Sequence, residues 1–198
     1  MKKTMTGLCV LAAMMLAAGT AMAADSGFYA ALDAGRSKAK DACTGIPAGF
    51  SCSNTGTVIR IGGGYQLNDN FGAEISYGDY GDSNANGVVL GIPISATING
   101  SGFQASVVGS LPIGESFALT GKLGVANTKV KASATGGGFG VNASATNTTG
   151  VFGIGVRYQL SNSVALRAQY EDLGNVGDAV TTGKSRLTLL TVGVAIGF

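Results

Sequence analysis

Large apolar residues alternate with small or polar residues through most of the chain after residue 26. A period of two residues indicates β-strands with one apolar face and one face of small or polar side chains. Eight segments of this kind can be placed, at residues 27–37, 57–67, 71–80, 101–111, 117–129, 149–160, 164–173 and 186–198. The pattern therefore predicts an all-β chain of eight strands.

The last of these segments ends the chain. Its apolar positions alternate with small residues and are Leu190, Val192, Val194, Ile196 and Phe198. A closing strand that ends on an aromatic residue is typical of outer-membrane β-barrels, in which aromatic side chains lie at the membrane interface. We interpret these five residues as a C-terminal assembly signal.

The connections between the segments alternate in length. Residues 68–70, 112–116 and 161–163 are short and turn-like, whereas residues 38–56, 81–100, 130–148 and 174–185 are long. Short periplasmic turns and long extracellular loops characterise bacterial outer-membrane barrels. The sequence thus predicts an eight-stranded antiparallel up-and-down transmembrane β-barrel with both termini periplasmic. Residues 131–148 are almost entirely Gly, Ala, Ser, Thr and Asn, and we expect a flexible loop there.

Aromatic residues mark both ends of the apolar faces. One group lies beside the short turns and comprises Tyr65, Phe71, Phe117, Tyr158 and Phe198, and the other comprises Tyr77, Phe103, Phe152 and Tyr170. A tilted transmembrane strand needs ~9–11 residues, so the two groups fit the two membrane interfaces. The alternative is a soluble β-sandwich or a lipocalin-type barrel. The 33 glycines favour a narrow lumen over a packed sandwich core.

The N-terminus has the features of a secretory signal peptide. Lys2 and Lys3 precede an apolar run, residues 8–18, that is too short to span a bilayer, and residues 21–23 supply a small-x-small cleavage pattern. We expect cleavage after Ala23 or one residue later, which leaves residues 24–198 as a single barrel domain. The alternative is an N-terminal anchor helix.

Charge and hydropathy narrow the class of protein further. The full chain has 13 basic and 11 acidic residues, and loss of Lys2 and Lys3 leaves 11 of each. This balance gives no sign of a nucleic-acid partner. Mean hydropathy is +0.31, yet no apolar run after the signal approaches 18 residues. A chain of this kind must satisfy its backbone polar groups in closed strands if it enters lipid.

Charged side chains share the face opposite the apolar band. They are Asp33, Arg60, Glu74, Lys122, Arg157, Arg167 and Glu171, and their distances from the turns place them near the middle of the barrel. Charges in so narrow a lumen need partners, because an isolated buried ion costs several kcal/mol.

One pair in this set can be predicted from an internal repeat. Residues 65–67 and 71–77 match residues 158–160 and 164–170, and the offset of 93 residues also relates Glu74 to Arg167. The two residues thus lie at equal levels on opposite strands. We expect them to meet across the lumen, with Lys122 competing for Glu74. The network either satisfies a polar core or acts as a gate.

The chain resembles the OmpA-type transmembrane domain and the wider group of OmpX-like and opacity-type small barrels. Residues 27–35, GFYAALDAG, and residues 64–67, GYQL, carry this resemblance beside the terminal strand and the inward charges. It implies that an inward Glu and its basic partners plug or gate the lumen, which corresponds here to Glu74, Arg167 and Lys122. Full OmpA-type proteins add a peptidoglycan-binding domain after the barrel, so we do not expect cell-wall anchoring here.

The remaining chemistry is sparse. Cys43 and Cys52 are the cysteines left after processing, and in an exported chain we expect a disulfide between them; the alternative is two free thiols. The chain contains no histidine, so the His-dependent mechanisms of barrel lipases and proteases cannot be assembled. We expect no enzyme activity, no cofactor and no metal site.

Three classes of function follow. We favour a structural and surface-exposed envelope protein whose long loops contact host cells or phage. We expect outer-membrane lipid, periplasmic chaperones and the barrel-assembly machinery as partners, and a monomer as the oligomeric state. The second class is a narrow gated porin for ions or very small solutes. The third, a binder of hydrophobic ligands, is disfavoured because the predicted lumen is lined by Gly, Ser, Gln and charged residues.

Overall fold

The structure is a computed structural model that describes residues 27–45, 49–89 and 91–198. The predicted signal peptide, residues 1–23, lies outside the described residues, as does the start of the predicted domain at residue 24. None of the described residues forms a helix long and apolar enough to cross a membrane.

The described residues form nine strands that belong to one antiparallel sheet. They are β1 (Gly27–Ala39), β2 (Ser51–Ser53), β3 (Thr55–Gln66), β4 (Phe71–Val89), β5 (Ile92–Ile113), β6 (Phe117–Gly136), β7 (Phe139–Gln159), β8 (Val164–Val176) and β9 (Ser185–Gly197). Eight of them pair in chain order, and β1 also pairs with β9, which closes the ring. The short β2 pairs with the outer part of β4. The predicted eight-stranded antiparallel barrel is confirmed.

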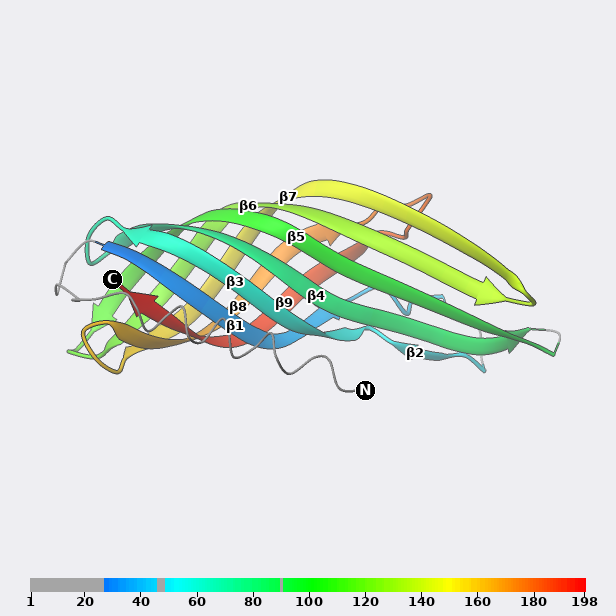
Figure 1. The fold of residues 1–198 in the computed structure, drawn as a ribbon, viewed down its shortest axis with the longest axis horizontal. Helices are drawn as coiled ribbons and strands as arrows, with labels where there is room; N and C mark the ends of the chain where they lie inside the picture. Colours follow the sequence, from blue (N-terminus) through cyan, green and yellow to red (C-terminus); the bar gives the residue numbers. More distant parts are fainter. Residues whose placement is uncertain (1–26, 46–48, 90) are drawn as a thin grey trace.

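The two ends of the barrel differ (Figure 1). At one end lie residues 67–70, 114–116 and 160–163, which join successive strands, together with Gly27 and the C-terminus. We call this the turn end. At the opposite end β4 to β7 reach well beyond the other strands, and we call it the hairpin end. The predicted strand boundaries at the turn end agree with the structure to within two residues.

Two of the predicted long loops are wrong. Residues 81–100 and 130–148 lie almost wholly in strands, because β4 pairs with β5 as far as Val89 and β6 pairs with β7 as far as Gly136. The alternation continues there with small residues, as in the pair Ala132 and Ala143. Small side chains give a weak hydrophobic signal. The sequence pattern therefore predicts a loop there, although the period of two persists.

The β6–β7 hairpin turns on two glycines. Gly137 and Gly138 both have positive φ, 59° and 82°, and they separate the last paired residues, Gly136 and Phe139. Positive φ at both central residues is the requirement of a type I′ turn, which matches the twist of antiparallel strands. Residues 130–148 therefore form a defined hairpin, and the expectation of a flexible loop is corrected.

The first long connection carries the predicted disulfide. Cys43 and Cys52 are joined, with a Cα–Cα distance of 5.9 Å. Cys52 lies in β2 and pairs with Ala85 of β4. The disulfide and this short pairing together fasten the first connection to the outer part of β4.

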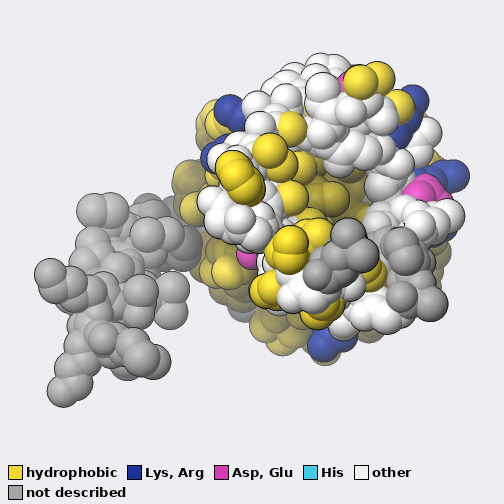
Figure 2. Space-filling model, turned by 90° about the vertical axis from the view of Figure 1, so that its right-hand side faces the viewer, with side chains coloured by type: hydrophobic (Ala, Val, Ile, Leu, Met, Phe, Trp, Pro, Cys, Tyr) yellow, Lys and Arg dark blue, Asp and Glu magenta, His cyan; other side chains and the backbone are white. Residues whose placement is uncertain are grey.

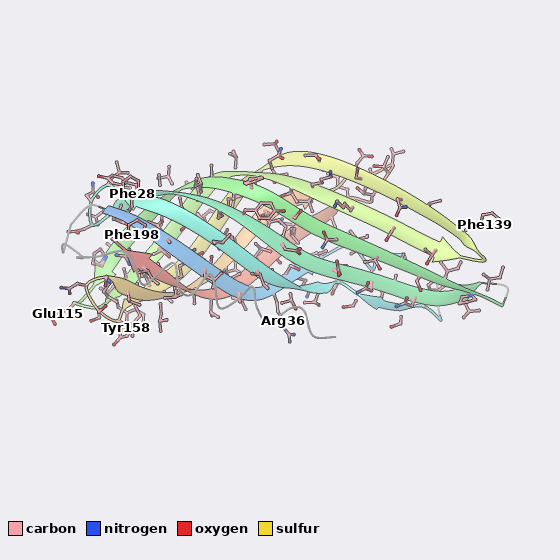
Figure 3. The ribbon with its side chains drawn as sticks, viewed as in Figure 1. Phe28, Arg36, Glu115, Phe139, Tyr158 and Phe198 are labelled. Carbon is pink, nitrogen blue, oxygen red and sulfur yellow. A yellow bond between two sulfur atoms is a disulfide. The ribbon has the colours of Figure 1, made fainter. Side chains whose placement is uncertain are left out.

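The outward face of the barrel is apolar and bounded by aromatic residues. All nine predicted interface aromatics are exposed on the isolated chain. Cross-strand neighbours stack at both levels, since Tyr77 and Phe103 have ring centroids 4.7 Å apart and Phe117 and Tyr158 have centroids 5.3 Å apart. Figure 3 shows Phe28, Tyr158 and Phe198 together at the turn end. An apolar outward face that extends between two levels of aromatic residues is stable only in lipid.

The inward face is crowded at several of its glycines. A Cβ atom on Gly193 would collide with Asp33 Oδ1 and with the carbonyl oxygen of Leu32. By contrast, a Cβ atom on Gly121, which lies on the outward face, would meet nothing within 4 Å. The narrow barrel thus needs glycine at specific inward positions, beyond a general preference for small residues.

We predict that Gly193→Ala lowers the unfolding free energy by about 1–3 kcal/mol, the usual cost of an added group in a packed interior. Gly121→Ala is the matched control and should change it by less than about 1 kcal/mol. Urea unfolding in detergent, followed by tyrosine fluorescence and heat-modifiable gel mobility, measures both. Equal effects of the two substitutions would contradict the assignment of a crowded inward face.

Candidate functional site

Six of the seven inward charges predicted from the sequence meet in the middle of the lumen. They come from five strands and are Asp33, Arg60, Glu74, Lys122, Arg167 and Glu171. Each residue is at most 8% exposed, and the inward parity of the strands aims every one of these side chains at the barrel axis. We call these six residues the charge ring.

One half of the charge ring is organised by Asp33. Arg60 Nε lies 3.0 Å from Asp33 Oδ2, and Arg167 Nη2 lies 2.7 Å from the same oxygen. Arg167 Nε also donates a hydrogen bond to Asp33 Oδ1 at 2.7 Å. Asp33 is therefore held between two arginines that come from β3 and β8.

The other half is organised by Lys122. Its Nζ lies 2.8 Å from Glu74 Oε1 and 3.2 Å from Glu171 Oε1. Glu171 Oε1 also lies 2.7 Å from Arg60 Nη2, and Glu74 Oε2 lies 2.5 Å from Arg167 Nη1. The six ion pairs therefore form a closed cycle in which every acid lies between two cations and every cation between two acids.

The cycle is electrically neutral, with three carboxylates and three cations. Burying a charge costs several kcal/mol, and attraction in the interior offsets that cost only when the partners are well placed. Here each charge has two partners at ion-pair distance. Neutral groups add further hydrogen bonds, from Gln104 Nε2 to Glu171 at 3.0 Å and from the Tyr29 hydroxyl to Glu74 at 3.1 Å.

Glu74 and Arg167 are in direct contact across the lumen, from opposite strands β4 and β8. Lys122 does not displace Arg167, because the two cations contact different oxygens of the Glu74 carboxylate. Gln104, Tyr29 and Gln169, whose Oε1 accepts a hydrogen bond from Arg60 Nη2 at 2.9 Å, were not predicted from the sequence. Their inward parity was visible, but uncharged side chains gave no reason to single them out.

Arg157 does not join the charge ring, and the expectation that it completes the network is corrected. Among the described residues, its side chain takes part in no ion pair and no hydrogen bond. It lies on β7 beside Arg167 of β8 and lines a cavity of about 170 Å³ at the turn end. We call this cavity the vestibule.

The lumen between the charge ring and the hairpin end is mainly apolar, with a few buried hydroxyl groups such as that of Thr128. A buried cluster there contains Val58, Tyr80, Ala126, Val130, Val151, Leu173, Val176, Leu187 and Leu189. The predicted lining of Gly, Ser, Gln and charged residues is therefore wrong for this half of the barrel. Figure 2, viewed from the hairpin end, shows hydrophobic side chains inside the hollow. The apolar cluster and the charge ring fill successive levels of the lumen.

Two β-bulges contribute to this apolar cluster. In β4 the register shifts between Asp79 and Asp82, and in β8 it shifts between Asp172 and Asn175. At each bulge the aspartate accepts a hydrogen bond from the N–H of a glycine two residues later, Gly81 at 2.8 Å and Gly174 at 2.9 Å. The residues enclosed by these turns, Tyr80 and Leu173, are buried in the lumen.

The charge ring and the apolar cluster together can close the lumen. No group of three or more metal-ligating acidic, cysteine or histidine side chains occurs within residues 27–45, 49–89 and 91–198. The C-terminal residues predicted as an assembly signal lie along β9 and its end, and Leu190, Val192 and Phe198 are exposed on the outward face.

A closed ring of eight antiparallel strands with an apolar wall between aromatic bands defines an outer-membrane β-barrel. The family model described as "Outer membrane protein beta-barrel domain" matches residues 8–198, and the chain belongs to this family.

Individual relatives agree with this assignment. The chain is 32% identical over 196 residues to outer membrane protein P5 of Haemophilus influenzae, an alignment that covers 89% of this chain and 53% of P5. It thus spans about half the length of that relative. Its fold is similar to that of Ail, the attachment invasion locus protein of Yersinia pestis, with 17% identity, 87% and 97% of the two chains covered and a TM-score of 0.54. Its fold is also similar to that of the N-terminal β-barrel domain of Pseudomonas aeruginosa OprF, with 12% identity, 88% of this chain and 98% of that chain covered, and a TM-score of 0.51.

We predict that Lys122→Met lowers the unfolding free energy by about 3–5 kcal/mol, because it leaves Glu74 and Glu171 with an uncompensated negative charge. Adding Glu74→Gln should recover part of this loss, since it leaves the balanced chain Arg167–Asp33–Arg60–Glu171. Urea unfolding in detergent measures both variants.

Arg157→Gln is the matched control for this experiment, because it removes an inward cation that lies outside the charge ring. It should change the unfolding free energy by no more than about 1 kcal/mol. A loss in Arg157→Gln as large as that in Lys122→Met would contradict the closed cycle.

Proposed function

We propose that the protein is a closed outer-membrane barrel that displays a rigid β-sheet at the cell surface for contact with host cells or phage. The observation that carries this proposal is the extension of β4 to β7 beyond the aromatic residues of the hairpin end. From Phe103, β5 continues to Ile92, which at ~3.3 Å per residue is about 36 Å of strand. A structural role in the membrane alone would not need this extension.

The orientation of the barrel belongs to the same proposal. The turn end, with both termini, faces the periplasm, and the hairpin end faces the outside. The short connections at the turn end support this orientation, since short turns are periplasmic in barrels of this class. During biogenesis, periplasmic chaperones and the barrel-assembly machinery recognise the final strand with Phe198, and the mature protein is a monomer in outer-membrane lipid.

The faces of the projecting sheet support surface display. Its outward positions carry polar side chains such as Lys131, Ser133 and Ser144, whereas inward positions carry small apolar residues such as Ala132 and Ala143. The polar outward side chains are exposed. Because a continuous ladder of backbone pairs holds the sheet, it presents these side chains in fixed positions to a binding partner.

A narrow gated porin is the second candidate. It is favoured by the geometry of Glu74, whose two oxygens contact Lys122 and Arg167, so that an exchange of partners is within reach of one side chain. The charge ring and the apolar cluster argue against a porin, because they fill successive levels of the lumen.

The closed barrel predicts no steady single-channel current from the refolded mature protein in a planar bilayer. Arg167→Ala should also be silent, because the apolar cluster still fills the lumen. Insertion is verified by heat-modifiable gel mobility of the protein recovered from the bilayer lipid. A steady or flickering wild-type current that changes in Arg167→Ala would instead establish the gated pore.

Surface display predicts that the projecting sheet is required for cell contact and dispensable for folding. A variant that replaces residues 84–97 and 132–143 with Asn-Gly turns shortens both hairpins and keeps their register. Bacteria that display this variant should retain the folded barrel but lose adherence to cultured host cells and adsorption of phage. Adherence and adsorption equal to those of the full chain would refute the proposal.

A further inference from the structure

The vestibule contains a cation, Arg157, that does not belong to the charge ring. It lies at the turn end of the lumen, and residues from the terminal region and the short turns, including Phe28, Gln66 and Ser163, line it. The residues that line it also include the polar residues Tyr29, Thr120, Arg157, Gln159 and Gln169. It therefore combines a mouth at the turn end with a polar interior.

The vestibule has an unbalanced positive charge. The charge ring is neutral by itself, so Arg157 is a surplus cation among the inward charges of the described barrel. Glu74 also lines the vestibule, but its carboxylate already accepts from Lys122, Arg167 and the Tyr29 hydroxyl. Among the described residues, no carboxylate oxygen lies within 4 Å of the Arg157 guanidinium.

The position of Arg157 makes this imbalance more costly. Arg157 and Arg167 are directly opposite each other on β7 and β8 and both line the vestibule. Like charges that face each other across a strand pair are destabilising. Arg167 is compensated by Asp33 and Glu74, but Arg157 has no comparable acid. An anion beside Arg157 would remove the repulsion and the surplus charge together.

The cavity has room for such an anion. Its volume of about 170 Å³ compares with ~30 Å³ for one water in the liquid, so a tetrahedral or planar oxyanion fits with some of its hydration. A guanidinium presents five N–H donors in a planar fork that matches two oxygens of a phosphate or carboxylate. The hydroxyl of Thr120 and the amide of Gln169 line the same space.

We propose that the vestibule is a binding site for a small oxyanion, such as phosphate, sulfate or a carboxylate, with Arg157 as its main contact. The site is reached from the turn end and lies on that side of the charge ring. The proposed anion site is independent of surface display by the hairpins and of ion conduction through the barrel.

The test is a titration of the refolded protein in an uncharged maltoside detergent, followed by amide NMR shifts of Thr120 and Gln159. Sodium phosphate, sulfate and acetate are added separately, and sodium chloride of equal ionic strength and pH serves as the reference. We expect saturable shifts at the vestibule with at least one oxyanion. Acetate alone identifies a carboxylate site, and phosphate or sulfate identifies a tetrahedral one.

Arg157→Gln should weaken this binding about tenfold or more, since a hydrogen-bonded charge is lost. Arg157→Lys retains the charge without the fork and should bind with intermediate affinity. Lys38→Gln removes an exposed cation near the other end of β1 and should bind like the wild type. Gel mobility establishes that each variant is folded.

Three results would overturn the proposal: shifts that never saturate in the wild type, equal shifts with chloride, or unchanged affinity in folded Arg157→Gln and Arg157→Lys. The first two would mean that the vestibule senses ionic strength only. The third would place any anion elsewhere in the barrel.

Discussion

The pairing of β1 with β9 is the constraint on which the rest of the molecule depends. Lipid offers no hydrogen bonds, so every backbone group in the wall must find its partner in a neighbouring strand, and only a closed ring leaves no edge. Closure with eight strands leaves an interior just wide enough for side chains. The inward glycines, such as Gly193 against Asp33, and the dense packing of charges in the lumen both follow from that width.

The same width explains the alternating charges. Six ionised side chains from five strands share one level of the lumen. Because acids and cations alternate around the cycle, each side chain contacts two partners of opposite charge. The cycle links β1, β3, β4, β6 and β8 through their side chains, across the axis as well as around it. It thus couples strands that the backbone ladder does not join.

Much of this structure could be predicted from the sequence, for identifiable reasons. Strands that face lipid on one side have a strong period of two, and the turns beside Phe71 and Val164 are short and polar, so the barrel and its turn end were predicted closely. The hairpin end was not, because the strands around Ala132 and Ala143 have no large apolar residues. The contact of Glu74 with Arg167 was predicted from the repeat of 93 residues. Whether Arg157 belongs to the charge ring depends on which of the long basic side chains reach the three carboxylates in three dimensions.

The two-glycine turn and the unbroken ladder of the β6–β7 hairpin have a consequence for how this surface can change over generations. Backbone hydrogen bonds, and not the identities of the outward side chains, hold Ser133 and Ser144 in place. Replacement of such outward residues leaves the ladder and the inward alanines intact. If this sheet is displayed at the cell surface, as we propose, it can acquire new side chains, and with them new partners or escape from old ones, while the membrane-embedded wall stays the same.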